Sequence, residues 1–208
     1  KIIRDPQVLF VPEEISLKVS GVSLEKKSWR TVLLYKPKGI VTTRSDEKNR
    51  PTVFSLLDPA HGYLHPVGRL DMATTGLLLL TNDTRLSSWL TDPVNQIIRT
   101  YLVTVEGLIT DKDVDVLLKG VIEKGELLKA DYALLRKASG RESHLTLQLT
   151  EGKNREIRRL FDTLGHEVTA LKRVAFGGLQ LDALKPGESR SMTKAEIIKA
   201  FGRAWCKE

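Results

Sequence analysis

Apolar residues recur at helical spacing most clearly between Arg155 and Leu164. Leucine, isoleucine and phenylalanine side chains fall at i, i+3, i+4 and i+7 in this stretch, so they form one apolar face: Ile157, Leu160, Phe161 and Leu164. The three arginines of the same stretch fall on another face. Gly165 is typical of the residue that follows a helix. The pattern therefore predicts an amphipathic helix over 155–164.

The remaining pattern predicts further short strands and helices. Expected strands are Thr31–Tyr35, a strand–turn–strand unit at Val67–Leu80, Tyr101–Val105, Leu145–Leu149 and Val168–Phe176. Expected helices are Leu86–Asp92 and Asp111–Lys119, with one or two helical turns at Thr52–Leu57. A last helix is expected to begin after a capping box formed by Thr193 and Glu196 and to end near Phe201. Further strands are expected at Val8–Val11 and Ile15–Val19.

These elements follow one another without a regular strand–helix alternation. Such an order favours an α+β fold with a mixed, largely antiparallel sheet over a doubly wound parallel fold.

The net charge of +7 is distributed unevenly along the 208 residues. Residues 26–50 carry eight lysines and arginines against two acids, whereas residues 106–131 carry seven acids and four lysines. A segregated basic region favours a phosphate-bearing partner such as a nucleic acid. A solvated basic loop is the alternative that charge alone leaves open.

The segment Val67–Asp83 holds the most informative candidate for chemistry. Arg69 and Asp71 stand among short apolar residues, just before the leucine run Leu77–Leu80. A carboxylate so close to a core strand is expected to be largely desolvated and to need a cationic partner, as many catalytic carboxylates do. A surface turn with an incidental ion pair fits the same residues.

Several other site types have no signal in the sequence. The single cysteine, Cys206, allows no internal disulfide, and the four histidines lack metal-ligand spacing. We see no phosphate-binding loop, nucleophile-elbow serine, dinucleotide fingerprint, signal peptide or bilayer-spanning apolar run. We therefore expect a cytoplasmic protein with no cofactor, no metal and no membrane association.

Four ordered blocks resemble the motifs of the RsuA-type rRNA pseudouridine synthases. The blocks are KPKG (36–39), GRLDMATTGLLLLTND (68–83), RTYLVTVEG (99–107) and EGKNREIRRLFDTLGHEVTALKRVAFGG (151–178). Their order and spacing are similar to those of the family, which makes the resemblance more specific than a single short motif. It implies an α+β fold of two subdomains with a central catalytic cleft, acting without cofactor or metal.

The resemblance also implies roles for individual residues. Asp71 matches the catalytic carboxylate, which attacks the ribose carbon or removes a sugar proton. Arg158 matches the basic residue that pairs with it, and Tyr101 the tyrosine that stacks on the target base. Arg69 corresponds to an arginine that enters the RNA where the base is flipped out. Candidates for phosphate contacts are Lys36, Lys38, Arg44, Lys153 and Arg155.

The domain division follows from the same resemblance. Residues 1–25 are expected to be the tail of an N-terminal alpha-L-type RNA-binding domain plus a linker, and residues 26–208 the catalytic domain. We therefore expect weaker RNA binding than for a chain with that domain complete.

The expected function is isomerisation of a ribosomal RNA uridine to pseudouridine, by a monomer acting on RNA or on a pre-ribosomal particle. The last block favours large-subunit over small-subunit RNA. A non-catalytic RNA-binding or ribosome-assembly protein is the main alternative. A cofactor-free hydrolase using Asp71 and Arg158 is a third, but it lacks a second carboxylate or a nucleophile–base pair.

Overall fold

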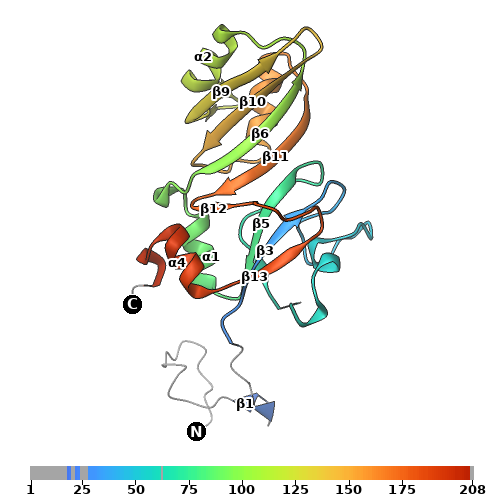
Figure 1. Cartoon of the computed structure of the whole chain (residues 1–208), viewed down its shortest axis with the longest axis vertical. Helices are drawn as coiled ribbons and strands as arrows, with labels where there is room; N and C mark the ends of the chain where they lie inside the picture. Colours follow the sequence, from blue (N-terminus) through green and yellow to red (C-terminus); the bar gives the residue numbers. More distant parts are fainter. Residues whose placement is uncertain (1–17, 20–21, 24–27, 62, 207–208) are drawn as a thin grey trace.

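Thirteen strands and four α-helices make up the part of the chain that the structure describes, namely residues 18–19, 22–23, 28–61 and 63–206 of a computed structural model (Figure 1). The strands are β1 (Lys18–Val19), β2 (Val22–Ser23), β3 (Thr31–Lys36), β4 (His65–Pro66), β5 (Thr75–Thr81), β6 (Arg99–Glu106), β7 (Val121–Glu123), β8 (Glu126–Leu128), β9 (Tyr132–Ala138), β10 (Glu142–Leu149), β11 (Val168–Phe176), β12 (Leu179–Gln180) and β13 (Ser189–Met192). The helices are α1 (Thr84–Thr91), α2 (Asp111–Lys119), α3 (Glu156–Thr163) and α4 (Lys194–Phe201), with 3-10 turns at Val53–Leu56, Pro59–His61, Pro93–Asn95 and Ala204–Cys206.

One nine-stranded sheet runs through both halves of the molecule in the order β13-β3-β5-β11-β6-β10-β9, and β4 and β12 pair at its side. Figure 1 shows β3, β5 and β13 in the lower half and β6, β9 and β10 in the upper half, with β11 joining them. The β5–β11 pair is parallel, and the other strand pairs within the described residues are antiparallel. The register of the parallel β5–β11 pair contains two residue pairs, Thr75 with Lys172 and Gly76 with Arg173. The two halves are therefore joined through a short parallel contact.

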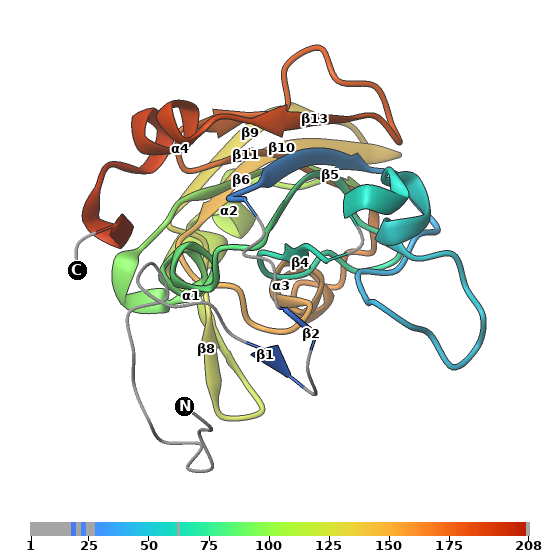
Figure 2. The same ribbon diagram turned by 90° about the horizontal axis from the view of Figure 1, so that it is seen from below.

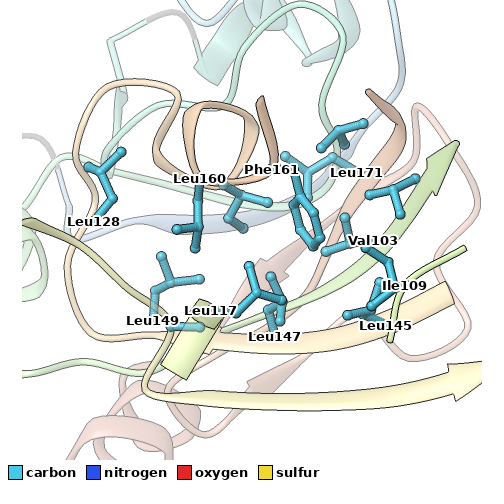
Figure 3. Close-up of a cluster of buried hydrophobic side chains, with 14 residues drawn as sticks. Val103, Ile109, Leu117, Leu128, Leu145, Leu147, Leu149, Leu160, Phe161 and Leu171 are labelled. Carbon is cyan, nitrogen blue, oxygen red and sulfur yellow. The ribbon is translucent and has the colours of Figure 1, made fainter. Parts of the chain in front are cut away.

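Each half has its own apolar core. In the upper half, α3 places Leu160 and Phe161 against leucines and valines of β6 and β10, and Figure 3 shows these side chains pointing toward one another. In the lower half, β3 and β5 are buried on both faces. Figure 2 shows α4 following β13 along one edge, with α3 below the strands.

The strongest sequence patterns are confirmed. The bounds of β11 and α2 are those expected, and Thr193 and Glu196 form the capping box of α4. The amphipathic helix is α3, but Arg155 has left-handed backbone (φ 49°) and precedes it. The unit expected at 67–80 is wrong in its first part, because residues 67–74 are a loop and the partner strand β4 ends at Pro66. The strand expected at Val8–Val11 lies outside the described residues, as does most of the one at 15–19.

The helices of the described residues include none that is long and apolar enough to cross a membrane.

Candidate active site

A cavity of about 310 Å³ lies where the two halves of the sheet meet. Its walls come from the loop before β5, from β6 and β11, and from the segment that leads into α3. Six lining residues carry the candidate chemistry: Arg69, Asp71, Tyr101, Lys153, Arg155 and Arg158. Its volume is at the lower end of the range for small-ligand pockets, and so suits a single nucleoside.

The loop that carries Asp71 is held through its backbone. Five consecutive carbonyl groups, 70 to 74, each accept a hydrogen bond. The donors are Thr42 Oγ1 to Leu70 (2.8 Å), Thr74 N–H to Asp71 (2.9 Å), Gly39 N–H to Met72 (2.8 Å), Arg158 Nη2 to Ala73 (3.4 Å) and Lys36 Nζ to Thr74 (2.8 Å). Because four of these five donors come from distant segments, the position of Asp71 depends on the assembled fold rather than on the local sequence alone.

The Asp71 carboxylate is more accessible than expected. Its side chain is 36% exposed, so the prediction of a largely desolvated carboxylate is wrong. The loop turns the side chain toward the cavity mouth, whereas the core strand begins only at Thr75. An open carboxylate can reach a substrate that enters from solvent.

The cation nearest to Asp71 is Arg155, whose Nη1 lies 3.7 Å from Oδ2. Among the ion pairs between described residues, Asp71 has no pair with Arg158 within 4.0 Å. The Arg158 guanidinium instead donates to the carbonyls of Val168 (2.7 Å) and Ala73 (3.4 Å). The expected direct pair of Arg158 with Asp71 is therefore absent from this structure, and Arg158 supports the Asp71 loop through its backbone.

Asp71 still influences Arg158 electrostatically. Burial lowers the pKa of the Arg158 guanidinium, and the like charge of Arg155 lowers it further, while Asp71 opposes both effects. Arg155, which precedes α3, and Arg158, which lies in its first turn, therefore both interact with the Asp71 carboxylate. Arg155 is the closer of the two.

Lys36 corrects another expectation. It was a candidate for phosphate contact, but its side chain is fully buried at the end of β3, where Nζ donates to the carbonyls of Thr74 and Pro37. A side chain with no exposed surface cannot contact an RNA phosphate. Burial lowers the pKa of Lys36 to about 8, and the nearby Asp71 opposes that shift. Lys36 is therefore an internal support of the Asp71 loop.

Replacing Lys36 with methionine should remove a pH-dependent part of the stability. The pKa of Lys36 is about 8 in the folded chain against an ordinary value of 10.5. Between these values the unfolded chain binds more protons, so Lys36 makes the native protein more stable as pH rises. The free energy of unfolding of the native protein, minus that of Lys36→Met, should therefore increase from pH 8 to pH 10.5. A flat difference in urea titrations contradicts this.

Tyr101 lies on β6 at the seam between the halves. Its ring is partly buried and packs against the apolar cores of both halves, and it lines the cavity. The expectation that it meets a substrate base is compatible with this position.

The other predicted RNA contacts are spread around the cavity mouth. Arg69 and Arg155 are exposed and line the cavity, and Lys38 is exposed in the turn after β3. Lys153 also lines the cavity, but its ammonium group pairs with Glu151 at 2.7 Å. The Arg44 guanidinium donates to the Leu64 carbonyl and lies over the Phe54 ring, outside the cavity lining.

Two buried arginines in the cavity wall were not predicted. Arg99 is 7% exposed and Arg173 is 2% exposed, and both guanidinium groups lie over the ring of Phe176. The Arg99 guanidinium donates to three backbone carbonyls, those of Ile97, Thr150 and Leu90. The available signal was an arginine between apolar residues in a predicted strand, as Arg173 is in β11, but Lys172 beside it gives the same signal and is not fully buried.

Glu156, the first residue of α3, adds a buried carboxyl group to the same wall. It is 4% exposed; Oε2 accepts from the backbone N–H of Lys153, and Oε1 has no hydrogen-bond partner among the described residues. Burial raises its pKa, and the bond from Lys153 opposes that shift only in part.

Glu156→Gln should stabilise the protein at pH 7. Because the pKa of Glu156 is raised on folding, the native state binds more protons than the unfolded chain above the ordinary value of 4.5, and stability is lost as pH rises from there. Glutamine removes this loss, so the urea midpoint of the variant should exceed that of the native protein at pH 7. The gain in stability should shrink as the pH approaches 4.5. A gain that does not change with pH would contradict the explanation through the Glu156 pKa.

The described residues contain no group of three or more histidine, cysteine, aspartate or glutamate side chains placed to hold a metal ion.

Comparison with known proteins gives one consistent result. Residues 30–163 match the family model described as RNA pseudouridylate synthase. Ribosomal large subunit pseudouridine synthase B of Bacillus subtilis (strain 168) is 35% identical over 184 residues, which are 87% of this chain and 75% of that protein. Ribosomal small subunit pseudouridine synthase A of Escherichia coli (strain K12) is 35% identical over 199 residues, or 95% and 85% of the two chains. A crystal structure of a pseudouridylate synthase superposes with a TM-score of 0.74 at 34% identity, covering 84% of this chain and 75% of that one.

The chain therefore belongs to the RNA pseudouridylate synthase family. Its relatives and motifs assign it to the RsuA-type branch, and it is an enzyme of the isomerase class.

Proposed function

We propose that this protein isomerises a uridine of ribosomal RNA to pseudouridine, with Asp71 as the catalytic carboxylate. The observation that carries the proposal is the cavity between the halves, where Asp71, Tyr101 and Arg158 meet. The relatives named above are, by their names, enzymes of ribosomal RNA from the large and the small subunit. We favour the large subunit on the sequence of the block at 151–178.

The Asp71 carboxylate supplies the chemistry in this proposal. It lines the cavity and is held by a loop in which the carbonyl groups of residues 70–74 all accept hydrogen bonds. It either attacks C1′ of the target ribose or removes a proton from the sugar. Arg155 stabilises its negative charge at 3.7 Å, and Arg158 fixes the loop behind it.

The base itself contacts Tyr101. A target uridine in a stem must leave the base stack to react, and flipping carries an unstacking cost of a few kcal/mol. Tyr101 lines the cavity with its partly buried ring, and the exposed Arg69, which also lines the cavity, fills the gap left in the RNA in this proposal.

The phosphate backbone is held by exposed cations near the mouth. We assign these contacts to Arg69, Arg155, Lys38 and, less directly, Lys153 and Arg44. Residues 26–208 form the catalytic unit in this proposal, acting as a monomer in the cytoplasm on RNA or a pre-ribosomal particle.

The test is tritium release from ribosomal RNA transcripts that carry 5-tritiated uridine. Formation of the C1′–C5 bond expels the hydrogen from C5, so each isomerisation releases one labelled proton. Small- and large-subunit transcripts are assayed side by side, and the modified position is then mapped. Release from one of them identifies the substrate RNA, whereas binding to both without release supports the alternative of a non-catalytic RNA-binding protein.

A further inference from the structure

Arg173 is the residue of the cavity wall that the chemistry above leaves without a role. It is 2% exposed and lies on β11, directly after the half-buried Lys172. The sheet register pairs it with Tyr101 on β6 and with Gly76 on β5. Directly paired residues of antiparallel strands place their side chains on the same face, about 5 Å apart. Arg173 therefore lies beside the ring proposed to carry the base.

The Arg173 guanidinium has donors left over. Nε donates to the Leu77 carbonyl at 2.8 Å, whereas Nη2 is buried with no hydrogen-bond partner among the described residues. Among the described residues, no carboxylate forms an ion pair with the Arg173 guanidinium within 4.0 Å. Arg99, in the same wall, donates to three carbonyls through its two Nη groups. An unpaired buried cation is costly, and such groups concentrate at functional sites.

The proposed reaction produces a negative charge on the uracil base, which the positively charged Arg173 guanidinium can stabilise. When C1′–N1 breaks, the electron pair stays on the uracil, and its negative charge is shared by N1 and the two carbonyl oxygens. After the base rotates, C5 uses a pair to bond C1′, the C5 proton is lost, and N1 gains a proton. The charge develops by either route open to Asp71.

We propose that Arg173 is a catalytic residue that donates a hydrogen bond from its guanidinium to a carbonyl oxygen of the target uracil and stabilises the negative charge of the departing base. The inference rests on the proposed function. A fixed donor aimed at developing charge lowers the barrier, because it interacts more strongly with the transition state than with the neutral base.

The test compares two leaving groups under single-turnover conditions. RNA substrates contain either uridine or 5-fluorouridine at the target, and the loss of that nucleoside is followed by chromatography after digestion. Fluorine leaves C5 without a proton to lose, so after the C1′–C5 bond forms the base keeps its fluorine and adds water across N1 and C6. Fluorine at C5 makes the uracil anion more stable, so its departure depends less on an external cation. Arg173→Lys should lower the rate with uridine by about 100-fold. With 5-fluorouridine the loss should be at least tenfold smaller.

Arg99→Lys is the matched control, because Arg99 is a buried arginine of the same wall whose Nη donors are bonded to backbone. It should slow both substrates by the same factor. Arg173→Gln, which keeps a planar N–H donor on a shorter side chain without the charge, is prepared in parallel and should show the same dependence on the leaving group, so a folding defect in one variant does not decide the outcome. Thermal unfolding and RNA affinity are measured for all.

An equal loss on both substrates for the Arg173 variants, or no loss, overturns the proposal and leaves Arg173 as a packing residue. If the native protein converts neither the uridine RNA nor the 5-fluorouridine RNA, the proposed function itself fails. This outcome can be told apart from failure of the Arg173 proposal, because it is seen with the native protein alone.

Discussion

Asp71→Asn should abolish turnover while leaving RNA affinity almost unchanged. Loss of a catalytic carboxylate or nucleophile typically costs about 10⁴-fold or more in rate. Asparagine has nearly the same shape and keeps the loop hydrogen bonds, which involve only backbone carbonyls of residues 70–74. It removes one negative charge near RNA phosphates, so the dissociation constant should stay equal or fall slightly. Single-turnover tritium release and filter binding measure the two quantities.

Asp115→Asn is the matched control, since Asp115 is exposed on α2 and is not part of the cavity lining. This variant should retain the native rate. If Asp71→Asn keeps more than a tenth of the native rate, Asp71 is not the catalytic carboxylate.

Gly76→Ala should destabilise the fold by about 4 kcal/mol or more, or prevent folding. Gly76 has φ +109°, and a Cβ atom built on it would lie 2.1 Å from the Arg173 carbonyl oxygen. The neighbouring atom is backbone of β11, so it cannot move aside as a side chain could. One methyl group would therefore separate β5 from β11, the pair that joins the two halves. Urea unfolding, or soluble yield if the variant fails to fold, measures the effect.

Gly187→Ala separates the cost of close contact from that of backbone conformation. Gly187 has φ +88°, but no atom lies within 4 Å of the position that the alanine Cβ would occupy. Only the positive φ is penalised there, at about 1 kcal/mol. Equal destabilisation by both variants would show that the approach of β5 to β11 is not the limiting constraint.

The sequence patterns that specified elements correctly are those with burial on a defined face. Val168–Phe176 and Asp111–Lys119 were predicted with their observed bounds. Among the strands that were not predicted, β9 and β13 are the two edge strands of the sheet, and β9 exposes Tyr132 and Leu134. An edge strand pairs on one side only, so its local sequence is less constrained.

The contacts within the candidate site could not be predicted from the sequence. Asp71, Tyr101 and Arg158 line one cavity, and their roles in it stay a prediction. That Arg155 rather than Arg158 approaches Asp71 depends on the left-handed backbone of Arg155 and on a carbonyl 85 residues away from Arg158. The burial of Lys36 and Arg173 depends likewise on how β3, β5 and β11 come together, which no local pattern specifies.

The short parallel contact between β5 and β11 has a consequence for how the protein is made. During synthesis, β5 leaves the ribosome about 100 residues before β11, and the sheet cannot close across its centre until β11 has emerged. The cavity needs residues from both strands and from α3, so a nascent chain that ends before residue 173 carries the Asp71 loop without the walls that complete the pocket. The candidate pocket therefore cannot assemble before β11 has emerged, so a shorter nascent chain lacks the complete set of residues that line it.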